Sequence, residues 1–286
     1  MTATKGRLDV MGRKAKRVAG KPLNSLETLG GQLSFYGRAI AWIPASIKKY
    51  PKEITRLLAE VTFGTGGLAV ILGTFGVIIA MSMFTGAVVG MQGYASLNQI
   101  GAAVLTGFIS AYINTREIAP VIAALALSST VGCGFTAQLG AMRISEEIDA
   151  VEVMAVPSLP FLVTTRMIAG FVAVIPLYIV GLLSAYWASR GINIYLNGQS
   201  TGSYDHYFNL FLPPEDVLWS FGKVLVFAFV LIMIHCYYGY NASGGPAGVG
   251  VAVGTSVRTV IVTIALLDFF LSLAIWGTTT TVRLAG

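Results

Sequence analysis

The sequence predicts an all-α membrane protein with five transmembrane helices. Hydrophobic residues make up 55% of its 286 residues, only 11% are charged, and the mean hydropathy is +0.74. Several apolar runs approach the ~20 residues with which a helix crosses a ~30 Å hydrocarbon core. These runs are continuously apolar, whereas the strands of a membrane barrel alternate, and they lack the charged outer face of a soluble helix bundle.

The N-terminal region is predicted to lie outside the bilayer. Residues 1–22 are polar and basic and are expected to form a mobile tail. Residues 23–60 are expected to form an interfacial amphipathic helix, from Leu23 to Lys52, and a basic connection, because apolar residues recur there at helical spacing. No short apolar core with a cleavage site follows the basic tail, so a secretory signal is not expected.

The membrane region is predicted to occupy residues 61–286. An apolar piece at 100–113 is too short to cross and is expected to be a re-entrant or interfacial helix. The polar stretch 190–216 is expected to be an exposed loop with a short helix, and the Gly-rich stretch 243–250 a tight connection. The five predicted spans are 64–91, 118–142, 161–187, 217–240 and 257–276.

The distribution of Lys and Arg predicts the orientation. Twelve of the 19 basic residues precede the first span, and with the N-terminus inside, the cytoplasmic segments also hold Arg143, Arg166 and Arg258. The remaining four are Arg116, Arg190, Lys223 and Arg283. This excess predicts a cytoplasmic N-terminus. Contact with anionic lipid also accounts for the net charge of +6, so no nucleic-acid partner is expected.

An acidic island at 145–152 stands between two long apolar runs. Its carboxylates are Glu146, Glu147, Asp149 and Glu152. Each would cost roughly 2.5–3.5 kcal/mol at bilayer depth, so the island is expected in water on the cytoplasmic side. On a helix, Ile148 would belong to an apolar stripe beside an acidic face, which suits a lever for a partner protein. A solvated loop with acids at a helix start fits the residues equally well.

Four ionisable residues fall near or inside the predicted spans, namely Arg116, Glu117, Lys223 and Asp268. Such residues are candidates for function, because their desolvation has to be offset by partners or water. Asp268, near the middle of the fifth span, could pair with a cation across a subunit cavity or with nearby hydroxyls, and function and packing both stay open for it. For the other three residues an interfacial anchor is favoured.

No catalytic or metal site is expected on this chain. Cys133 and Cys236 lie in apolar runs without a short spacing and are interpreted as packing residues. His235 is interpreted as packed and hydrogen-bonded. No His lies near the acidic island, which disfavours acid–base catalysis or a metal there. The sequence has no G-x-x-x-x-G-K-[ST] loop, so we expect no cofactor on this chain and no ATP hydrolysis by it alone.

Several short motifs occur in one consistent order. They are Arg116–Pro120, Gly140–Arg143, Glu146–Val151, Pro160–Val163 with Arg166, Cys236–Gly239 and Gly244–Gly250. Together they resemble the MlaE/YrbE family of ABC transporter permeases, over about residues 24–280. The Gly-rich variant and the long basic N-terminus look like a B-type YrbE subunit of an actinobacterial (mycobacterial) Mce lipid transport system.

The resemblance implies a permease domain at 61–286 whose coupling helix, at 143–156, docks on a separate ATPase. The implied coupling residues are Arg143, Glu146, Glu147, Asp149, Ala150 and Glu152. The implied partners are a second YrbE-type permease, a cytoplasmic ABC ATPase dimer that holds ATP and magnesium, and MCE-domain proteins outside the membrane. Such systems move lipids, for example fatty or mycolic acids, sterols or phospholipids, between the bacterial inner membrane and a tube of MCE proteins.

The chain departs from the family pattern at two places, and two other functions stay open. Gln138 stands where many relatives have Glu, and Ala155–Pro157 stands where Gly-Asp/Asn-Pro is usual. An ion-coupled secondary transporter would use Asp268, Glu117 and Lys223 as a relay, although the sequence shows no inverted repeat. The other alternative is a membrane scaffold that anchors an envelope-spanning MCE complex.

Overall fold

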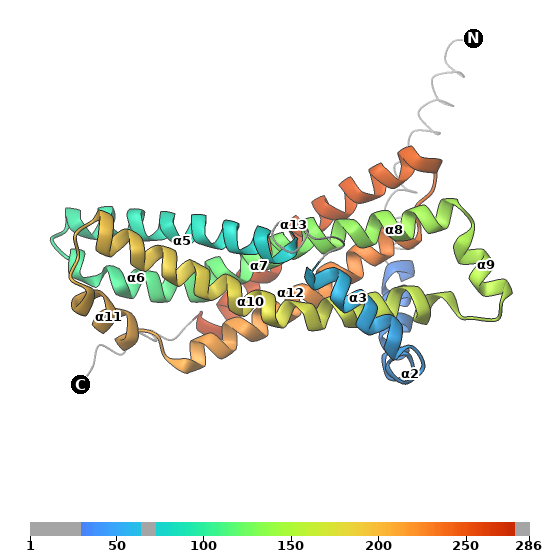
Figure 1. Cartoon of the computed structure of the whole chain (residues 1–286), viewed down its shortest axis with the longest axis horizontal. Helices are drawn as coiled ribbons and strands as arrows, with labels where there is room; N and C mark the ends of the chain where they lie inside the picture. The colour runs from blue at the N-terminus through green and yellow to red at the C-terminus, as the bar shows by residue number, and fades with distance from the viewer. Residues whose placement is uncertain (1–29, 64–72, 278–286) are drawn as a thin grey trace, which may run out of the picture.

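Five helices of the described chain are long and apolar enough to cross a membrane, which confirms the predicted all-α membrane protein. The structure, a computed structural model, describes residues 30–63 and 73–277, and this part of the chain contains no strand. Figure 1 shows the long helices running along an elongated molecule. The candidate spans are Thr74–Gln99 (α5), Ala103–Ile144, Leu159–Leu196, Pro214–Tyr240 (α12) and Gly245–Trp276 (α13).

The second and third spans are composite helices that contain π-helical turns. The second consists of η1 (Ala103–Leu105), α6 (Thr106–Ile113), η2 (Asn114–Ile118), α7 (Ala119–Leu127), η3 (Ser128–Gly132) and α8 (Cys133–Ile144). The third consists of η4 (Leu159–Thr164), α10 (Thr165–Gly191) and η5 (Ile192–Leu196). Four of these segments, η2 to η5, are π-helical, a conformation that is frequent at functional sites.

The apolar piece at 100–113, predicted to be a separate re-entrant or interfacial helix, is instead continuous with the second span, because α6 continues through η2 into α7. The whole run has 42 residues and is about 63 Å long, roughly twice the hydrocarbon thickness. Buried hydrogen bonds hold its first part: Tyr204 of α11 (Thr201–Leu210) donates to Ser110 at 2.7 Å, and Ser110 donates to Ser189 at 2.8 Å. α11 itself is the short helix predicted within 190–216.

α5 and α10 pack closely because small residues face each other at every fourth position. The facing pairs are Ser82 with Gly181, Gly86 with Ala185 and Gly90 with Ser189. A Cβ atom at Gly86 would overlap the carbonyl oxygen of Ala185, and one at Gly90 would lie 3.0 Å from the carbonyl oxygen of Ser189. Small residues let membrane helices approach to backbone contact in this way.

Three short helices replace the single amphipathic helix predicted from Leu23 to Lys52. Residues 30–41 form the N-terminal helix, and α2 (Ile43–Lys49) and α3 (Pro51–Phe63) follow it. Pro44 and Pro51 stand in the first turns of the new helices, where a missing N–H group costs little. The basic tail at 1–22, the start of the predicted amphipathic helix at 23–29 and the start of the first predicted span at 64–72 lie outside the described residues.

α13 begins earlier than predicted, so most of the Gly-rich stretch 243–250 is helical. Only residues 241–244 connect α12 to α13. Gly244 has φ +89°, a left-handed conformation that glycine adopts without steric cost. Pro246 lies in the first turn of α13, where proline favours a helix start. The stretch is therefore a helix start rather than a loop.

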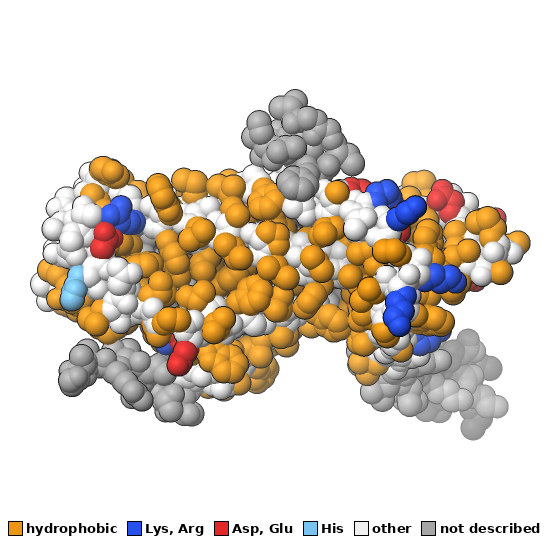
Figure 2. Space-filling model, turned by 60° about the horizontal axis from the view of Figure 1, so that its bottom comes forward, with side chains coloured by type: hydrophobic (Ala, Val, Ile, Leu, Met, Phe, Trp, Pro, Cys, Tyr) orange, Lys and Arg blue, Asp and Glu red, His pale blue; other side chains and the backbone are white. Residues whose placement is uncertain are grey.

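The two ends of the molecule differ in their content of Lys and Arg. α2 lies at one end together with α9 (Glu147–Val153), and α11 lies at the other end with the turn between α5 and α6 (Figure 1). Most Lys and Arg side chains on the face shown in Figure 2 gather at the α9 end. A one-sided excess of basic residues is typical of membrane proteins with a fixed orientation.

Candidate functional site

α9 is a short helix that projects between the second and third spans (Figure 1). It begins at Glu147 after a break at Glu146, whose φ of 62° is left-handed. Ile148 is fully buried and anchors the helix, whereas Glu147 and Asp149 are exposed in its first turn. Acids there interact favourably with the positive end of the helix dipole. α9 thus has one buried apolar side and an acidic face, but it is shorter than the coupling helix implied at 143–156.

Arg143 and Ala150 lie on the same protrusion as these acids. Arg143, in the last turn of α8, donates a hydrogen bond to Asp149 Oδ1 at 2.8 Å. Both side chains are well exposed, so the pair orients α9 and adds little stability. The Ala150 N–H donates to the carbonyl oxygen of Glu146 at 2.9 Å, at the start of the helix. The structure therefore brings the predicted coupling residues together around α9.

The tip of α9 is apolar, a feature that sequence reasoning missed. Val153 and Met154 are 87% and 67% exposed. Methionine is enriched in protein interfaces, whereas isolated charges are depleted from their cores. In the sequence, Val153 and Met154 directly follow Glu152, the last acid of the island that is expected in water, and this position indicates that they are exposed too. Exposed acids beside an exposed apolar tip suit contact with another protein.

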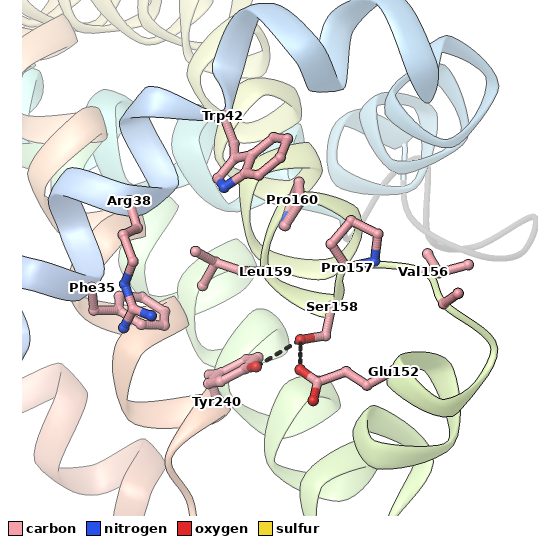
Figure 3. Close-up of a pocket in the computed structure, with 11 residues that line it drawn as sticks. Phe35, Arg38, Trp42, Glu152, Val156, Pro157, Ser158, Leu159, Pro160 and Tyr240 are labelled. Atoms are coloured by element: carbon pink, nitrogen blue, oxygen red, sulfur yellow. Dashed lines mark hydrogen bonds between the residues drawn. The ribbon is translucent and has the colours of Figure 1, made fainter.

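The end of α9 is tied to two other elements through Glu152. Ser158, which is 3% exposed, donates to Glu152 Oε1 and shares a hydrogen bond with the Tyr240 hydroxyl at 2.7 Å (Figure 3). Tyr240 ends α12, and Ser158 directly precedes η4. A displacement of α9 therefore has a short path of hydrogen bonds into the third and fourth spans.

A second group of predicted residues meets inside the membrane region, around Arg116. This side chain is 4% exposed and donates from Nε and Nη2 to Asp216 Oδ2 at 2.9 and 2.6 Å. Trp276 Nε1 donates to the other carboxylate oxygen at 2.9 Å. The Arg116 guanidinium also lies 4.1 Å from the ring centre of Tyr112. Charge-assisted hydrogen bonds and cation–π contact both stabilise a guanidinium away from water.

Lys223 connects Arg116 to the other two predicted residues, Glu117 and Asp268. Its Nζ lies 2.7 Å from Asp268 Oδ1 and 3.4 Å from Glu117 Oε2, and the residue is 1% exposed. Nζ also donates to the Arg116 carbonyl at 2.8 Å and to Ser272 Oγ at 2.7 Å. Ser272 Oγ in turn donates to Glu117 Oε1 at 2.9 Å. The buried charge network therefore comprises Arg116, Asp216 and Lys223 together with Glu117 and Asp268, whose side chains are 43% and 18% exposed, from η2, α12 and α13.

The interfacial-anchor role of Arg116, Glu117 and Lys223 stays a prediction. The structure shows Arg116 and Lys223 buried and paired with carboxylates on facing helices. Asp268 pairs with a cation of its own chain rather than across a subunit cavity. Sequence reasoning missed Asp216, because an acid in the first turn after two prolines is usual at a helix start.

The network and the α9 protrusion lie far apart along one continuous helix. Arg116 and Arg143 belong to the same run and are 27 residues apart, which corresponds to roughly 40 Å. The structure thus brings the predicted site residues into two groups rather than one. The second span connects them directly.

His235 and the cysteines have the structural roles predicted for them. His235 is fully buried, and its ring nitrogens lie 2.8 Å from Ser128 Oγ and 2.9 Å from Thr136 Oγ1. Cys236 is buried and Cys133 partly buried, and both thiols are free. The hydrogen bonds of His235 join α12 to η3 and α8.

Comparison with known proteins agrees with this arrangement. A family described as Permease MlaE matches residues 65–274, a region that contains α9 and the buried charge network. The intermembrane phospholipid transport system permease protein MlaE of Haemophilus influenzae is 28% identical over 202 residues, which cover 70% of this chain and 77% of that protein. A probable ABC transporter permease protein of Rickettsia bellii is 28% identical over 68% of this chain and 76% of its own length. A similar protein of Synechocystis is 30% identical over 68% of this chain and 75% of its own length. The chain belongs to the MlaE permease family.

Proposed function

We propose that the chain is the membrane-spanning subunit of an ATP-driven lipid transporter. Its family is one of permeases, and the similar Haemophilus influenzae protein is named for intermembrane phospholipid transport. The proposed cargo is a hydrophobic lipid, with phospholipids, fatty or mycolic acids and sterols as candidates. The proposed location is the bacterial inner membrane with the N-terminus in the cytoplasm, because the basic α9 end suits the cytoplasmic side.

This proposal rests mainly on the protrusion formed by α9 and the residues that flank it. The protrusion exposes Asp149 and the apolar tip, while Ile148 is buried and Glu152 is held by Ser158. A separate ATPase that docks on residues 143–156 would displace α8 and η4 together, because α9 connects them in the chain. ATP and magnesium would then be bound by the partner, and this chain would convert the partner's motion into movement of the spans.

α13 supports pairing with a second, YrbE-type permease. Only 11% of an 18-residue apolar stretch of α13 is buried against the described chain. Phe269 and Phe270 on this helix are 62% and 61% exposed. Such a face contacts either lipid or another apolar helix in the bilayer. The B-type Mce resemblance favours the second permease, with MCE-domain proteins on the outer side.

The test replaces Glu146, Glu147 and Asp149 together by Gln, Gln and Asn in the full chain, expressed with its ATPase. All three side chains are exposed, so the membrane region should fold as in the wild type. Copurification of the ATPase and lipid movement in reconstituted vesicles should both fall about tenfold or more. Glu215→Gln, an exposed acid at the opposite end, is the control and should change neither. Full ATPase binding and lipid movement in the triple variant would refute docking at α9.

The buried charge network favours an ion-coupled secondary transporter as a second candidate. Carboxylates and a lysine inside the membrane are typical of ion and proton pathways, and Lys223 contacts both Glu117 and Asp268. The same vesicles distinguish the two functions. Lipid movement that requires ATP and persists without ion gradients supports the ABC transporter, whereas movement driven by an ion gradient alone supports the second candidate. Copurification of MCE proteins without any ATPase would instead indicate a scaffold.

A further inference from the structure

A cavity of about 460 Å³ lies between the N-terminal helix and the chain segment that follows α9. Phe35 forms part of one wall and is 4% exposed, with its ring 5.5 Å from that of Tyr240. The opposite wall includes Pro157 and Pro160, which limit the freedom of the backbone after α9. The walls are therefore fixed by packing and by proline, and the cavity is part of the folded structure (Figure 3).

One cation and one carboxylate face this cavity from different elements. Figure 3 shows Arg38 on the N-terminal helix beside Phe35 and Glu152 beside Ser158, and both line the cavity. The Arg38 side chain is exposed and has no ion pair or hydrogen bond with another described residue. Glu152 accepts a hydrogen bond from Ser158 through Oε1, and for its Oε2 the described residues provide no donor. Both charges are thus available to a ligand.

The surface around the cavity has the composition of a membrane interface. On the helices that border it, Leu33, Ile40 and Ile47 are 69%, 42% and 50% exposed, while Lys48 is an exposed cation of the same region. Exposed apolar side chains beside lysines are typical of helices that lie in the membrane interface. Trp42 lines the cavity and is 44% exposed, and tryptophan is enriched at this depth.

We propose that this cavity binds the headgroup of a zwitterionic membrane phospholipid with a primary amine, of the phosphatidylethanolamine type. The Arg38 guanidinium binds the phosphate in the planar, two-pronged geometry that suits it. The ammonium group donates to Glu152, and the faces of Trp42 and Tyr240 provide cation–π contact. A purely anionic headgroup would meet the Glu152 carboxylate, and a purely cationic one would meet Arg38.

This site does not depend on the proposed transport function, although its Glu152 also belongs to the segment 143–156 on which the ATPase is proposed to dock. Glu152 lies in the last turn of α9, and Arg38 belongs to the N-terminal helix. A bound headgroup would therefore join the interfacial helix to the base of the protrusion. The lipid acts as a structural bridge between the membrane surface and α9.

The test measures retention of short-chain phosphatidylethanolamine and phosphatidylglycerol on the purified full-length chain by native mass spectrometry. The wild type should retain the ethanolamine lipid preferentially. Arg38→Ala should weaken its binding about tenfold or more, the usual effect of losing a hydrogen bond to a charged group. Lys48→Ala, which removes an exposed cation outside the cavity, is the matched control and should bind like the wild type.

Glu152→Gln separates headgroup recognition from loss of structure. Glutamine keeps a side-chain oxygen that can accept from Ser158 but loses the charge that would bind an ammonium group. The preference for phosphatidylethanolamine over phosphatidylglycerol should therefore fall to about parity, with unchanged thermal unfolding. Equal retention of both lipids by the wild type, or equal losses in Arg38→Ala and Lys48→Ala, would overturn the proposal.

Discussion

Replacing Arg116 by methionine should destabilise the membrane region strongly. In Arg116→Met, Asp216 keeps the hydrogen bond from Trp276 but loses two others, at 2.6 and 2.9 Å, together with its counter-charge. Asp216 is only 7% exposed, so water does not replace the guanidinium. Removing one partner of a buried ion pair costs about 3–5 kcal/mol, and the free energy of unfolding should fall by about that amount.

The double variant Arg116→Met/Asp216→Asn should recover much of this loss. It removes both charges together, and asparagine keeps an oxygen that can accept from Trp276. Replacing both members of a buried ion pair by uncharged residues often changes the free energy of unfolding little. The interaction energy from the double-mutant cycle should therefore reach about 2 kcal/mol or more.

Reversible unfolding in mixed detergent micelles with increasing SDS measures these free energies. Lys48→Met is the control, because Lys48 is exposed and has no ion pair within the described residues. Its stability should stay within about 0.5 kcal/mol of the wild type. The prediction is wrong if Arg116→Met is no less stable than Lys48→Met. It is also wrong if the losses of Arg116→Met and Asp216→Asn add up to the loss of the double variant, because the two residues would then not stabilise the membrane region as an ion pair.

Two further predictions concern helix packing and the end opposite α9. Gly86→Leu should cost about 3 kcal/mol or more in the same assay, because the side chain would enter the Ala185 backbone, whereas Gly222→Ala meets no atom within 4 Å and should be tolerated. Arg190 donates two hydrogen bonds of 2.8 Å to Asp205 and holds the pKa of that carboxyl below its usual range. The stabilisation is present above the unfolded pKa of about 4 and is lost as pH falls through the lower folded pKa. The free energy of unfolding of the wild type should therefore exceed that of Asp205→Asn by up to about 1 kcal/mol near neutral pH. A difference between the two that does not shrink in acid would contradict this prediction.

The membrane class, the presence of five spans and the exposure of the acidic island could all be predicted from the amino-acid sequence. These properties depend on local hydropathy and charge, since each ionised residue at bilayer depth carries its own desolvation cost. The spacing of Ile148 within the island also indicated an apolar seat for α9, and that side chain is fully buried. The motifs further indicated the family, which the match over residues 65–274 confirms.

The partners of the ionisable residues near the spans, and the ends of the composite helices, could not be predicted from the sequence and depend on the folded arrangement of the helices. Arg116 meets Asp216 from a helix that begins almost a hundred residues later, and Lys223 meets Asp268 across α12 and α13. The continuation of 100–113 into the second span depends on hydrogen bonds to Tyr204 and Ser189, which no apolar run reveals. Burial and pairing arise from contacts between residues far apart in the chain, and helical periodicity describes only near neighbours.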